Sequence, residues 1–332
     1  MARNAKAKVD MKKKGVQSVP EKMVCYVSEE GHHCLERSVE LIGLGNENLR
    51  WVKTNDEYQI DLVTLENSIK NDLCSGYHPF CVIGNAGTVN TGAFDDFDKL
   101  ADTASKYDMW FHIDGAFGAW VKLSETHRHL ADGLERADSL AVDLHKWMSM
   151  PCGIGCTLVR DRLAHYRTFV YGHEADYLKT SMDMIEELGL RLDDASMLSL
   201  ALSRSYNSLK AYMLFRAYGR GKYSRLVQQN LDQINHFADR LRFDPLFEVT
   251  APVVSNIVCF RYKPLGYSEE QIKVVNEKIR DALYETHLGV VSDTMANGVF
   301  SLRACNVSYR SRDEDFDNLI TRIKQIGTKI TI

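Results

Sequence analysis

The chain of 332 residues lacks any apolar run near the roughly 20 residues that a membrane-spanning helix needs. Its first residues, M-A-R-N-A-K-A-K, also lack the apolar core of a secretory signal peptide. From these two absences we expect a cytoplasmic protein with no membrane partner.

A strong excess of charge of either sign is missing as well. The chain has 41 Lys and Arg against 45 Asp and Glu, a net charge of −4, so we expect no broad nucleic-acid surface. The only biased segment is the N-terminus, where we favour a solvated helix face over a phosphate or nucleic-acid patch. The basic residues there are Arg3, Lys6, Lys8, Lys12, Lys13, Lys14 and Lys22, against only Asp10 and Glu21.

The cysteine pattern of a zinc site or a disulfide framework is also missing. The eight cysteines include no C-x-x-C pair. Cys152 and Cys156 lie four positions apart, with no second Cys or His pair nearby to complete a zinc site. We therefore expect free thiols in a reducing compartment and no bound metal.

Internal repeats and low-complexity segments are absent, and strand-like and helical patterns alternate instead. This alternation predicts an α/β fold with a mostly parallel sheet and helices on both faces. Residues 154–159 follow as an expected antiparallel return strand. The expected strands are 23–28, 49–53, 79–84, 109–113 and 139–144; the expected helices are 6–15, 35–42, 62–73 and 96–107, with Asp95 or Asp96 as the cap of the last.

The second half of the chain has a different character. Residues 169–194 have no clear periodicity and are expected to form a functional or mobile loop. Long helical patterns follow, and the last third predicts a small α+β domain. We divide the chain into a large domain, residues 1–210, and a C-terminal domain, residues 211–332. The expected later elements are helices 195–220, 222–243 and 269–287, a helix from Glu314, and strands 247–250, 256–262, near Val290 and 300–305.

Two runs concentrate the polar groups that could carry chemistry. Residues 111–120 read F-H-I-D-G-A-F-G-A-W, and residues 137–147 read A-D-S-L-A-V-D-L-H-K-W. Each is an apolar, strand-like run that ends on polar side chains, and parallel sheets bind ligands at the carboxyl ends of their strands. A carboxylate and a lysine at one sheet edge suit a cofactor with a carbonyl and a basic ring nitrogen, namely pyridoxal phosphate.

Lys146 and Asp114 have the clearest expected roles. Partial desolvation at a strand end favours a neutral lysine amine, which forms a covalent bond with an aldehyde. The alternative is a lysine that simply extends into solvent. Asp114 would keep the pyridine nitrogen protonated, so that the ring accepts electrons from Cα; the alternative is a helix N-cap.

Other candidates surround this pair. Small residues after Asp114 would leave room beneath a flat ring, and a histidine could cover its other face. Hydroxyl and amide groups could contact the cofactor or simply close a turn. These candidates are Gly115 and Ala116 for the first role, His32 or His33 for the second, Thr88, Asn90 and Thr91 for the third, and His145 as a contact to phosphate or carboxylate.

The two runs resemble the group II pyridoxal-phosphate-dependent amino-acid decarboxylases. These include aromatic-amino-acid, tyrosine, glutamate, cysteine-sulfinate and diaminobutyrate decarboxylases. Similar segments occur along most of the chain. They are G-H-H-C-L-E-R-S at 31–38, A-G-T-V-N-T-G-A-F-D at 86–95, D-Y-L-K-T-S at 176–181, N-S-L-K at 207–210 and S-L-R-A-C at 301–305.

The resemblance implies a fold type I homodimer that converts an L-amino acid to its amine with pyridoxal phosphate. Lys146 would hold the cofactor, His32 would stack on its ring, and Tyr177 would protonate Cα from a mobile loop. A tyrosine at this position favours simple decarboxylation over aldehyde formation. The implied catalytic residues are Lys146, Tyr177 and His32; the implied cofactor contacts are Lys146, Asp114, Ala116, His32, His145, Thr88 and Asp143.

Two departures from the family pattern bear on activity. Relatives have a long segment before the part that matches Met1, including a Ser/Gly-rich turn that holds the phosphate at a helix N-terminus. Asp143 stands where some relatives have Asn, and an acid beside a phosphate is repulsive unless it is paired. Aminotransfer, C–C cleavage or an inactive remnant are the alternative functions, and the substrate side chain stays open.

Overall fold

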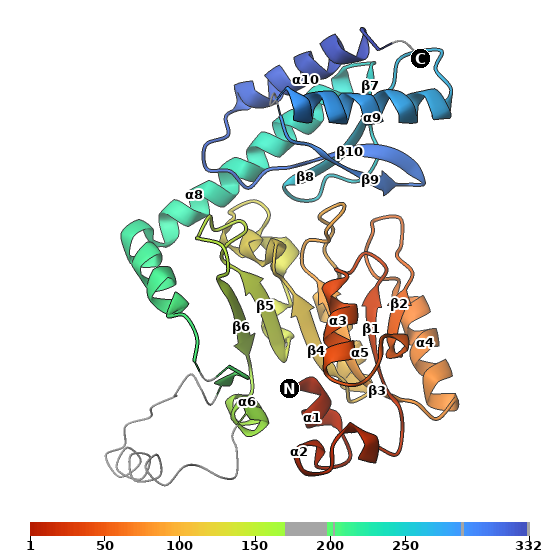
Figure 1. Ribbon diagram of the computed structural model, residues 1–332, viewed down its shortest axis with the longest axis vertical. Helices are drawn as coiled ribbons and strands as arrows, with labels where there is room; N and C mark the ends of the chain where they lie inside the picture. The colour runs from red at the N-terminus through yellow and green to blue at the C-terminus, as the bar shows by residue number, and fades with distance from the viewer. Residues whose placement is uncertain (170–197, 202, 287–288, 331–332) are drawn as a thin grey trace.

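The computed structural model describes residues 1–169, 198–201, 203–286 and 289–330. Figure 1 shows this part of the chain as two bodies, each built on one sheet. The long helix α8 (Asn207–Phe243) runs from the first body to the second.

The first sheet has the strand order β2-β1-β3-β4-β5-β6. Strands β1 to β5 pair in parallel, while β6 pairs antiparallel with β5. The predicted mostly parallel sheet and its antiparallel return strand are therefore confirmed. The strands are β1 (Met23–Ser28), β2 (Leu49–Val52), β3 (His78–Asn85), β4 (Trp110–Asp114), β5 (Ser139–Asp143) and β6 (Gly155–Val159).

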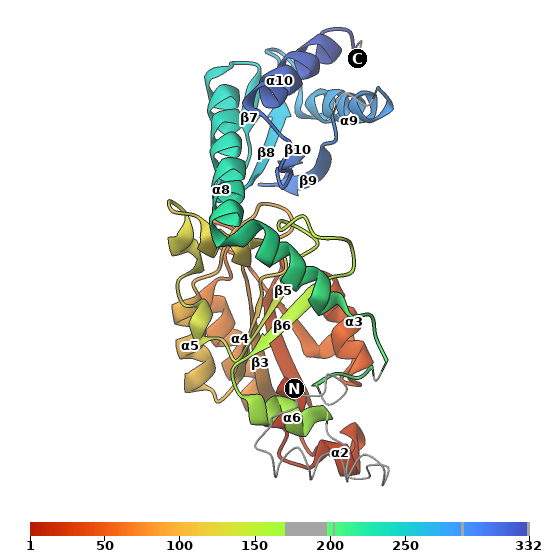
Figure 2. The same cartoon turned by 90° about the vertical axis from the view of Figure 1, so that its left-hand side faces the viewer.

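Side-chain alternation explains why helices cover both faces of this sheet. In β1, Val24 and Tyr26 belong to one buried cluster, and Cys25 and Val27 belong to another. Figure 2 shows α4 and α5 on one side of the sheet and α3 on the other. Both faces of the sheet are thus buried under helices, as expected for a parallel sheet. The helices of this body are α3 (Cys34–Leu41), α4 (Leu62–Cys74), α5 (Phe97–Lys106) and α6 (Arg162–Phe169).

The N-terminal residues differ from their prediction. The single basic helix expected at residues 6–15 is wrong, because the chain forms α1 (Ala2–Lys6) and α2 (Met11–Lys14). Asp10 separates them, since its side chain accepts hydrogen bonds from the first backbone N–H groups of α2. Short 3-10 helices occupy Val16–Ser18, Asn46–Asn48, Gly118–Leu123, Arg128–Ala131 and Leu134–Arg136.

The second body is the predicted α+β unit. Its antiparallel sheet has the order β7-β8-β10-β9. One face packs against α9, α10 and the end of α8. The other face, which includes Ile257 and Cys259, contacts Tyr58 and Phe117 of the first body. The elements are β7 (Phe247–Val249), β8 (Ile257–Tyr262), α9 (Glu269–Glu285), β9 (Ser292–Ala296), β10 (Val299–Cys305) and α10 (Asp313–Gly327).

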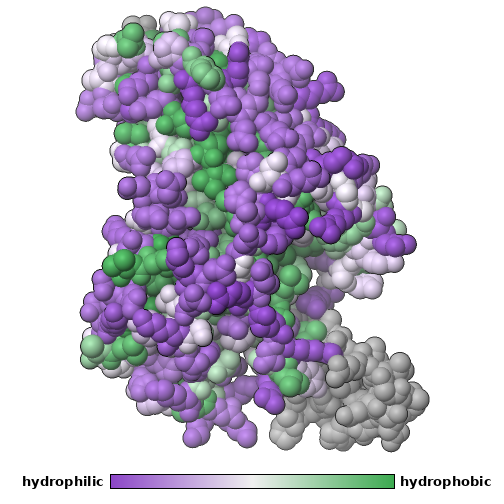
Figure 3. Space-filling view, turned by 180° about the vertical axis from the view of Figure 1, so that it is seen from behind, coloured by the Kyte–Doolittle hydropathy of each residue, from purple (hydrophilic) through white to green (hydrophobic). Residues whose placement is uncertain are grey.

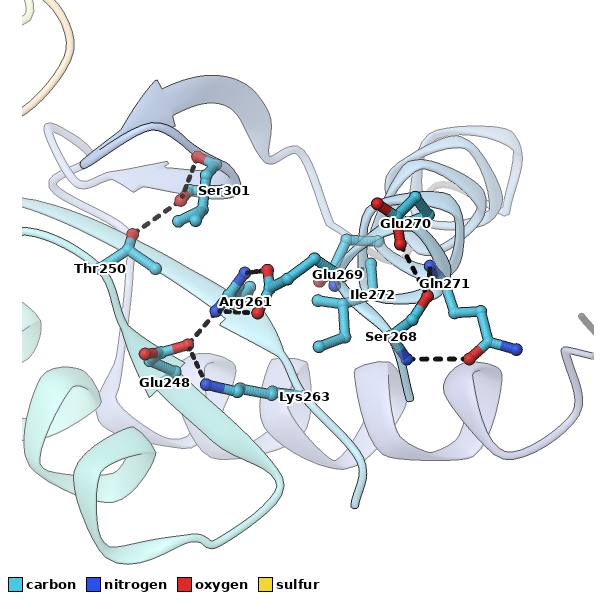
Figure 4. A network of polar contacts seen from close by, with 12 residues as sticks. Glu248, Thr250, Arg261, Lys263, Ser268, Glu269, Glu270, Gln271, Ile272 and Ser301 are labelled. Atoms are coloured by element: carbon cyan, nitrogen blue, oxygen red, sulfur yellow. Dashed lines mark hydrogen bonds and ion pairs between the residues drawn. The ribbon is translucent and has the colours of Figure 1, made fainter. Parts of the chain in front are cut away.

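A buried arginine ties three elements of this second body together (Figure 4). Arg261 on β8 donates to Glu248 of β7 at 2.6 Å and to Glu269 of α9 at 2.5 Å. Lys263 also pairs with Glu248, at 3.0 Å. Because its charge is fully partnered, Arg261 is tolerated in a buried position, whereas removing one partner would leave an uncompensated charge.

Helix α8 corrects another prediction. The helix expected to start at residue 195 begins at Asn207, and the described residues 198–201 and 203–206 contain no α-helix. Gly219 has a non-helical φ of 67° and kinks the helix. Along α8 the core changes from the first body at Leu231 to the second at Ile234. The division between residues 210 and 211 stays a prediction.

The surface is chiefly polar on the face drawn in Figure 3, where hydrophobic residues form separate patches. Within the residues that the structure describes, no helix has the length and apolar character needed to cross a membrane.

Candidate active site

Several strand ends of the first sheet meet at one edge. The register pairs Asn85 at the end of β3 with Asp114 at the end of β4, and Asp114 with Ala141 of β5. Asp143 ends β5, and Lys146 follows it in a turn. The carboxyl ends of parallel strands are where such sheets bind ligands. The structure therefore brings Asp114 and Lys146 to one edge.

Backbone hydrogen bonds shape the turn that carries Lys146. The amides of Leu144 and His145 both donate to the carbonyl of Ile154, at 3.0 and 3.3 Å. Leu144 and Trp147 on either side of the lysine point into the core and are buried. The apolar neighbours thus anchor the turn and leave the Lys146 side chain at the surface of the site.

Lys146 makes an ion pair that its sequence context did not predict. Its Nζ lies 3.0 Å from Oδ2 of Asp143, and its side chain is 40% exposed. The backbone of Asp143 is fixed by two bonds, from its N–H to the Ala116 carbonyl and from Trp120 Nε1 to its own carbonyl. Desolvation of the lysine is therefore only partial, and the Asp143 carboxylate holds the amino group.

Asp114 both closes a turn and presents a free acceptor. Its Oδ1 accepts a hydrogen bond from the Ala116 N–H at 3.1 Å. Its Oδ2 has no hydrogen-bond partner among the described residues. Asp114 is therefore not the helix N-cap that was its alternative, since the next helix begins at Gly118 with Phe117 at its N-cap; the turn-closing bond and the expected cofactor contact are compatible, because each uses a different carboxylate oxygen.

The turn after Asp114 is packed too tightly for larger side chains. A Cβ on Gly115 would lie 2.8 Å from Leu140 Cδ1, and a Cβ on Gly118 would overlap the carbonyl oxygen of Ala86. A Cβ on Gly87, which has a φ of +84°, would lie 3.0 Å from the Cα of Gly118. These contacts draw the loop after β3 against the turn after β4.

His32 lies close to both charged groups of the site. Its Nδ1 accepts a hydrogen bond from the Cys34 N–H at 3.1 Å, and its ring lies 4.2 Å from that of His33. Burial lowers the pKa of His32, the charges of His33 and Lys146 lower it further, and Asp114 opposes them. A neutral imidazole with its proton on Nε2 suits stacking on a flat ring.

His145 faces the same carboxylate as Lys146. Its Nδ1 lies 3.0 Å from the Ile154 carbonyl, so Nδ1 carries the proton and donates. Its Nε2 lies 3.9 Å from Asp143 Oδ2. The histidine is thus held by the backbone with Nε2 turned toward the site.

Thr88 lies in the loop after β3 but uses its hydroxyl locally. Its Oγ1 accepts from the Ala93 N–H at 3.0 Å and lies 3.0 Å from Thr91 Oγ1. Both hydroxyls are buried. The geometry thus favours the turn-closing role that was the alternative for this pair.

Asn90 connects the site loop to the second body. Its carbonyl accepts from Arg303 Nε at 3.0 Å, and Cys259 Sγ lies 3.4 Å from the same oxygen. Its side chain donates to Glu30 at 3.1 Å. Burial raises the pKa of Glu30. The role of Arg303 was not identified from the sequence, because the strand pattern of β10 does not indicate that its side chain contacts the loop of Asn90.

Asp95 is a second residue whose role sequence reasoning missed. Asp96 caps α5, whereas Asp95 is buried and accepts from the N–H groups of Ile60 and Asn85, each at 2.7 Å. The Asn85 side chain continues to Ser28 Oγ at 3.1 Å. Asp95 thus ties together the ends of β1 and β3, and two adjacent acids gave no signal of which was buried.

Two expectations remain, those for the catalytic tyrosine and for metal binding. Tyr177 lies outside the described residues. Across residues 1–169, 198–201, 203–286 and 289–330, no group of three His, Cys, Asp or Glu side chains is arranged to bind a metal ion.

Comparison with known proteins extends the match beyond the site. The family model described as the pyridoxal-dependent decarboxylase conserved domain matches residues 1–263. Aromatic-L-amino-acid decarboxylase of Bacillus atrophaeus is 29% identical over 94% of this chain and 64% of its own length. Tyrosine decarboxylase 2 of Arabidopsis thaliana is 30% identical over 88% of this chain and 53% of its own.

Solved structures agree on the fold. A crystal structure of Oryza sativa TDC with PLP and tryptamine superposes with a TM-score of 0.89 at 25% identity, covering 99% of this chain and 66% of the other. Mouse CSAD in its apo form gives 0.88 at 23% identity, covering 99% and 68%. The fold type I architecture is thus confirmed, and the chain spans less than two thirds of the two curated relatives.

Proposed function

Because the chain belongs to the family of pyridoxal-dependent decarboxylases, we propose that it binds pyridoxal phosphate and decarboxylates an L-amino acid to its amine. The observation that carries this proposal is the placement of Asp114 and Lys146 at one edge of the parallel sheet. A covalent attachment point and an acceptor for a protonated ring nitrogen are what this cofactor requires.

The residues present fit the cofactor on three counts. Oδ2 of Asp114 is available to the ring nitrogen, since it has no hydrogen-bond partner in the described ranges. The side chain of Ala116 is only a methyl group, which leaves room for a flat ring. His32 is kept neutral by its lowered pKa. When bound, the cofactor supplies an electron sink for the carbon that loses carbon dioxide.

Each side chain has a defined task in this proposal. Lys146 binds the cofactor carbonyl, and Asp143 orients its amine beforehand. Asp114 holds a proton at the ring nitrogen, and the His32 ring excludes water from one face. Tyr177, outside the described residues, is proposed from the resemblance to deliver the proton to Cα.

Reductive labelling tests the attachment directly. The chain is incubated with pyridoxal phosphate, reduced with borohydride and digested, and the modified lysine is found by mass spectrometry. Lys146→Ala should abolish labelling and carbon dioxide release. Lys122→Ala is a matched control, because Lys122 is 41% exposed and pairs with Asp132 at 3.0 Å, much like Lys146. Label on other lysines, with none on Lys146, would refute the proposal.

Product analysis identifies the reaction. Amine and carbon dioxide in equal amounts support decarboxylation, whereas a keto acid indicates aminotransfer and an aldehyde indicates cleavage or oxidation. A chain that binds no cofactor would support the interpretation as an inactive remnant.

We also propose a homodimer. Large hydrophobic side chains are exposed along the first half of α8, and β6 is largely exposed although parallel-type sheets are normally covered on both faces. Sedimentation equilibrium tests this, and a monomer at micromolar concentrations would contradict it. The exposed side chains on α8 are Leu209, Tyr212, Met213, Phe215 and Tyr218.

A cytoplasmic location is part of the same proposal. All eight cysteines lie in the described residues as free thiols, which suits a reducing compartment. Fractionation of cells that express the tagged chain would test this, and recovery with membranes or in the medium would contradict it.

A further inference from the structure

A chain of buried amides attaches the Lys146 turn to α8 and to the second body. Trp147 and Asn230 are both fully buried. The indole Nε1 of Trp147 donates to Asn230 Oδ1 at 3.0 Å, and Asn230 Nδ2 donates to the Ser308 carbonyl at 2.8 Å. One side chain on α8 therefore joins the residue beside Lys146 to the segment that follows β10.

The chain of amides continues within the second body. Asn306 donates to Gln233 Oε1 at 2.8 Å, and Gln233 donates to the Ser311 carbonyl at 2.6 Å. Asn256 donates to the Asn306 carbonyl at 2.7 Å. Buried bonds of this kind favour one arrangement strongly, because a group that loses its partner stays buried and unsatisfied.

Trp147 also contacts the other half of the site. Its ring stacks on that of Phe117, with centroids 5.7 Å apart and planes inclined by 16°. Phe117 belongs to the turn that follows Asp114. The same indole thus fixes the Lys146 turn against the Asp114 turn while its N–H group is held by Asn230.

The Trp147–Asn230 bond differs from the other bonds of the Lys146 turn in the segments that it joins. The backbone bonds that shape the turn stay within residues 144–154, and Lys146 itself pairs with Asp143, three positions before it in the chain. The Trp147–Asn230 bond leaves that segment and reaches α8. It therefore holds the turn against α8, whereas the bonds of the Asp143 backbone to Ala116 and Trp120 hold it against the turn after Asp114.

We infer that Asn230 is a positioning residue that acts through Trp147 to hold the Lys146 turn and to couple it to the second body. Its catalytic meaning rests on the proposed function, whereas the coupling itself does not. The coupling predicts that removing the Asn230 side chain speeds local opening of the Lys146 turn more than that of other parts of the first body.

Amide hydrogen exchange tests the coupling without cofactor. The reporters are the amides of Ser149 and Met150, which bond within the turn to the carbonyls of Lys146 and Leu144, both at 3.1 Å. Asn230→Ala should speed their exchange on the order of tenfold, the effect of one lost buried hydrogen bond.

A matched asparagine separates positioning from general destabilisation. Asn276 is also fully buried in a helix, and its side chain bonds the N–H and carbonyl of Tyr262, each at 2.8 Å. It has no contact with the Lys146 turn among these bonds. Asn276→Ala should lower overall stability but leave exchange at the turn unchanged. Equal acceleration in both variants would overturn the inference.

Two further variants and a labelling readout complete the test. Trp147→Phe keeps the ring stack but removes the N–H donor, so it should reproduce Asn230→Ala, and the double variant should add little. The rate of reductive labelling of Lys146 by pyridoxal phosphate should fall about tenfold in Asn230→Ala and not in Asn276→Ala.

The outcomes distinguish this inference from the function on which it rests. Unchanged exchange in Asn230→Ala, or additive effects in the double variant, would overturn the positioning role. An exchange difference as expected, with no labelling of the wild-type Lys146, would overturn the proposed function and leave the coupling supported.

Discussion

The buried carboxylate of Asp95 gives a prediction whose magnitude follows from the structure. Burial raises the pKa of Asp95 from 3.8 to about 6, although hydrogen bonds from Ile60 and Asn85 oppose the rise. At about 1.4 kcal/mol per pKa unit, ionising this group in the folded state costs ~3 kcal/mol. The carboxylate offsets part of the cost of its burial, because its two oxygens accept hydrogen bonds from the N–H groups of Ile60 and Asn85.

The sign of the pH dependence follows from linkage. The folded state holds the Asp95 proton more tightly than the unfolded state, so the free energy of unfolding falls as pH rises from 3.8 to about 6. Above that range the loss is complete and constant. Between about pH 4.5 and about pH 7.5 the loss from this group amounts to ~2 kcal/mol.

Asp95→Asn removes this dependence at a constant cost. The amide offers one acceptor oxygen, so one of the two backbone N–H groups of Ile60 and Asn85 loses its partner, at ~1–3 kcal/mol. The variant should therefore be less stable than wild type at low pH. The difference between their free energies of unfolding should shrink by ~2 kcal/mol toward neutral pH, because only the wild type loses stability over this range.

Urea unfolding at a series of pH values measures this gap. The adjacent Asp96 gives the control: burial raises its pKa, but its hydrogen bonds and ion pair with Lys99 outweigh this and lower it. Asp96→Asn should thus show no narrowing toward neutral pH. A constant gap between Asp95→Asn and wild type would refute the account of Asp95.

Two further predictions concern the turn after Asp114. Asp114→Ala should reduce turnover per bound cofactor by roughly 10²-fold while Lys146 still retains the cofactor, and equal losses of absorbance and turnover would contradict this. Gly118→Ala should destabilise the chain by ~1–3 kcal/mol in urea unfolding, because its Cβ overlaps the Ala86 carbonyl. Gly221→Ala should instead stabilise the chain by ~0.5–1 kcal/mol, because Gly221 lies in helix α8 and its Cβ would meet only the Arg225 side chain, at 3.6 Å.

The main sheet and the edge that carries the site were predictable because both depend on short-range patterns. Apolar, strand-like runs alternate with helical ones, which indicates a parallel sheet. Such a sheet forces Asp114 and Lys146, at the ends of two of its strands, to one side. The resemblance to relatives added expected roles, and the family match agrees with it.

The features that were missed depend on contacts between distant residues. Trp147 and Asn230 are 83 positions apart, and neither residue type in its own segment indicates the other. The start of α8 at Asn207 was placed too early because helical propensity continues upstream of it. Local patterns thus locate the site, whereas the contacts that hold it in place appear only with tertiary structure.

Asp143 shows how such a contact changes an interpretation. Beside a cofactor phosphate its carboxylate would be repulsive, yet in the structure it pairs with Lys146 at 3.0 Å. His145 Nε2 lies 3.9 Å from the same carboxylate oxygen, and the Ile154 carbonyl holds the other ring nitrogen of His145 at 3.0 Å. The Asp143 carboxylate therefore has two nitrogen groups of the same turn beside it, Lys146 and His145, and the order of residues in the sequence did not reveal this arrangement.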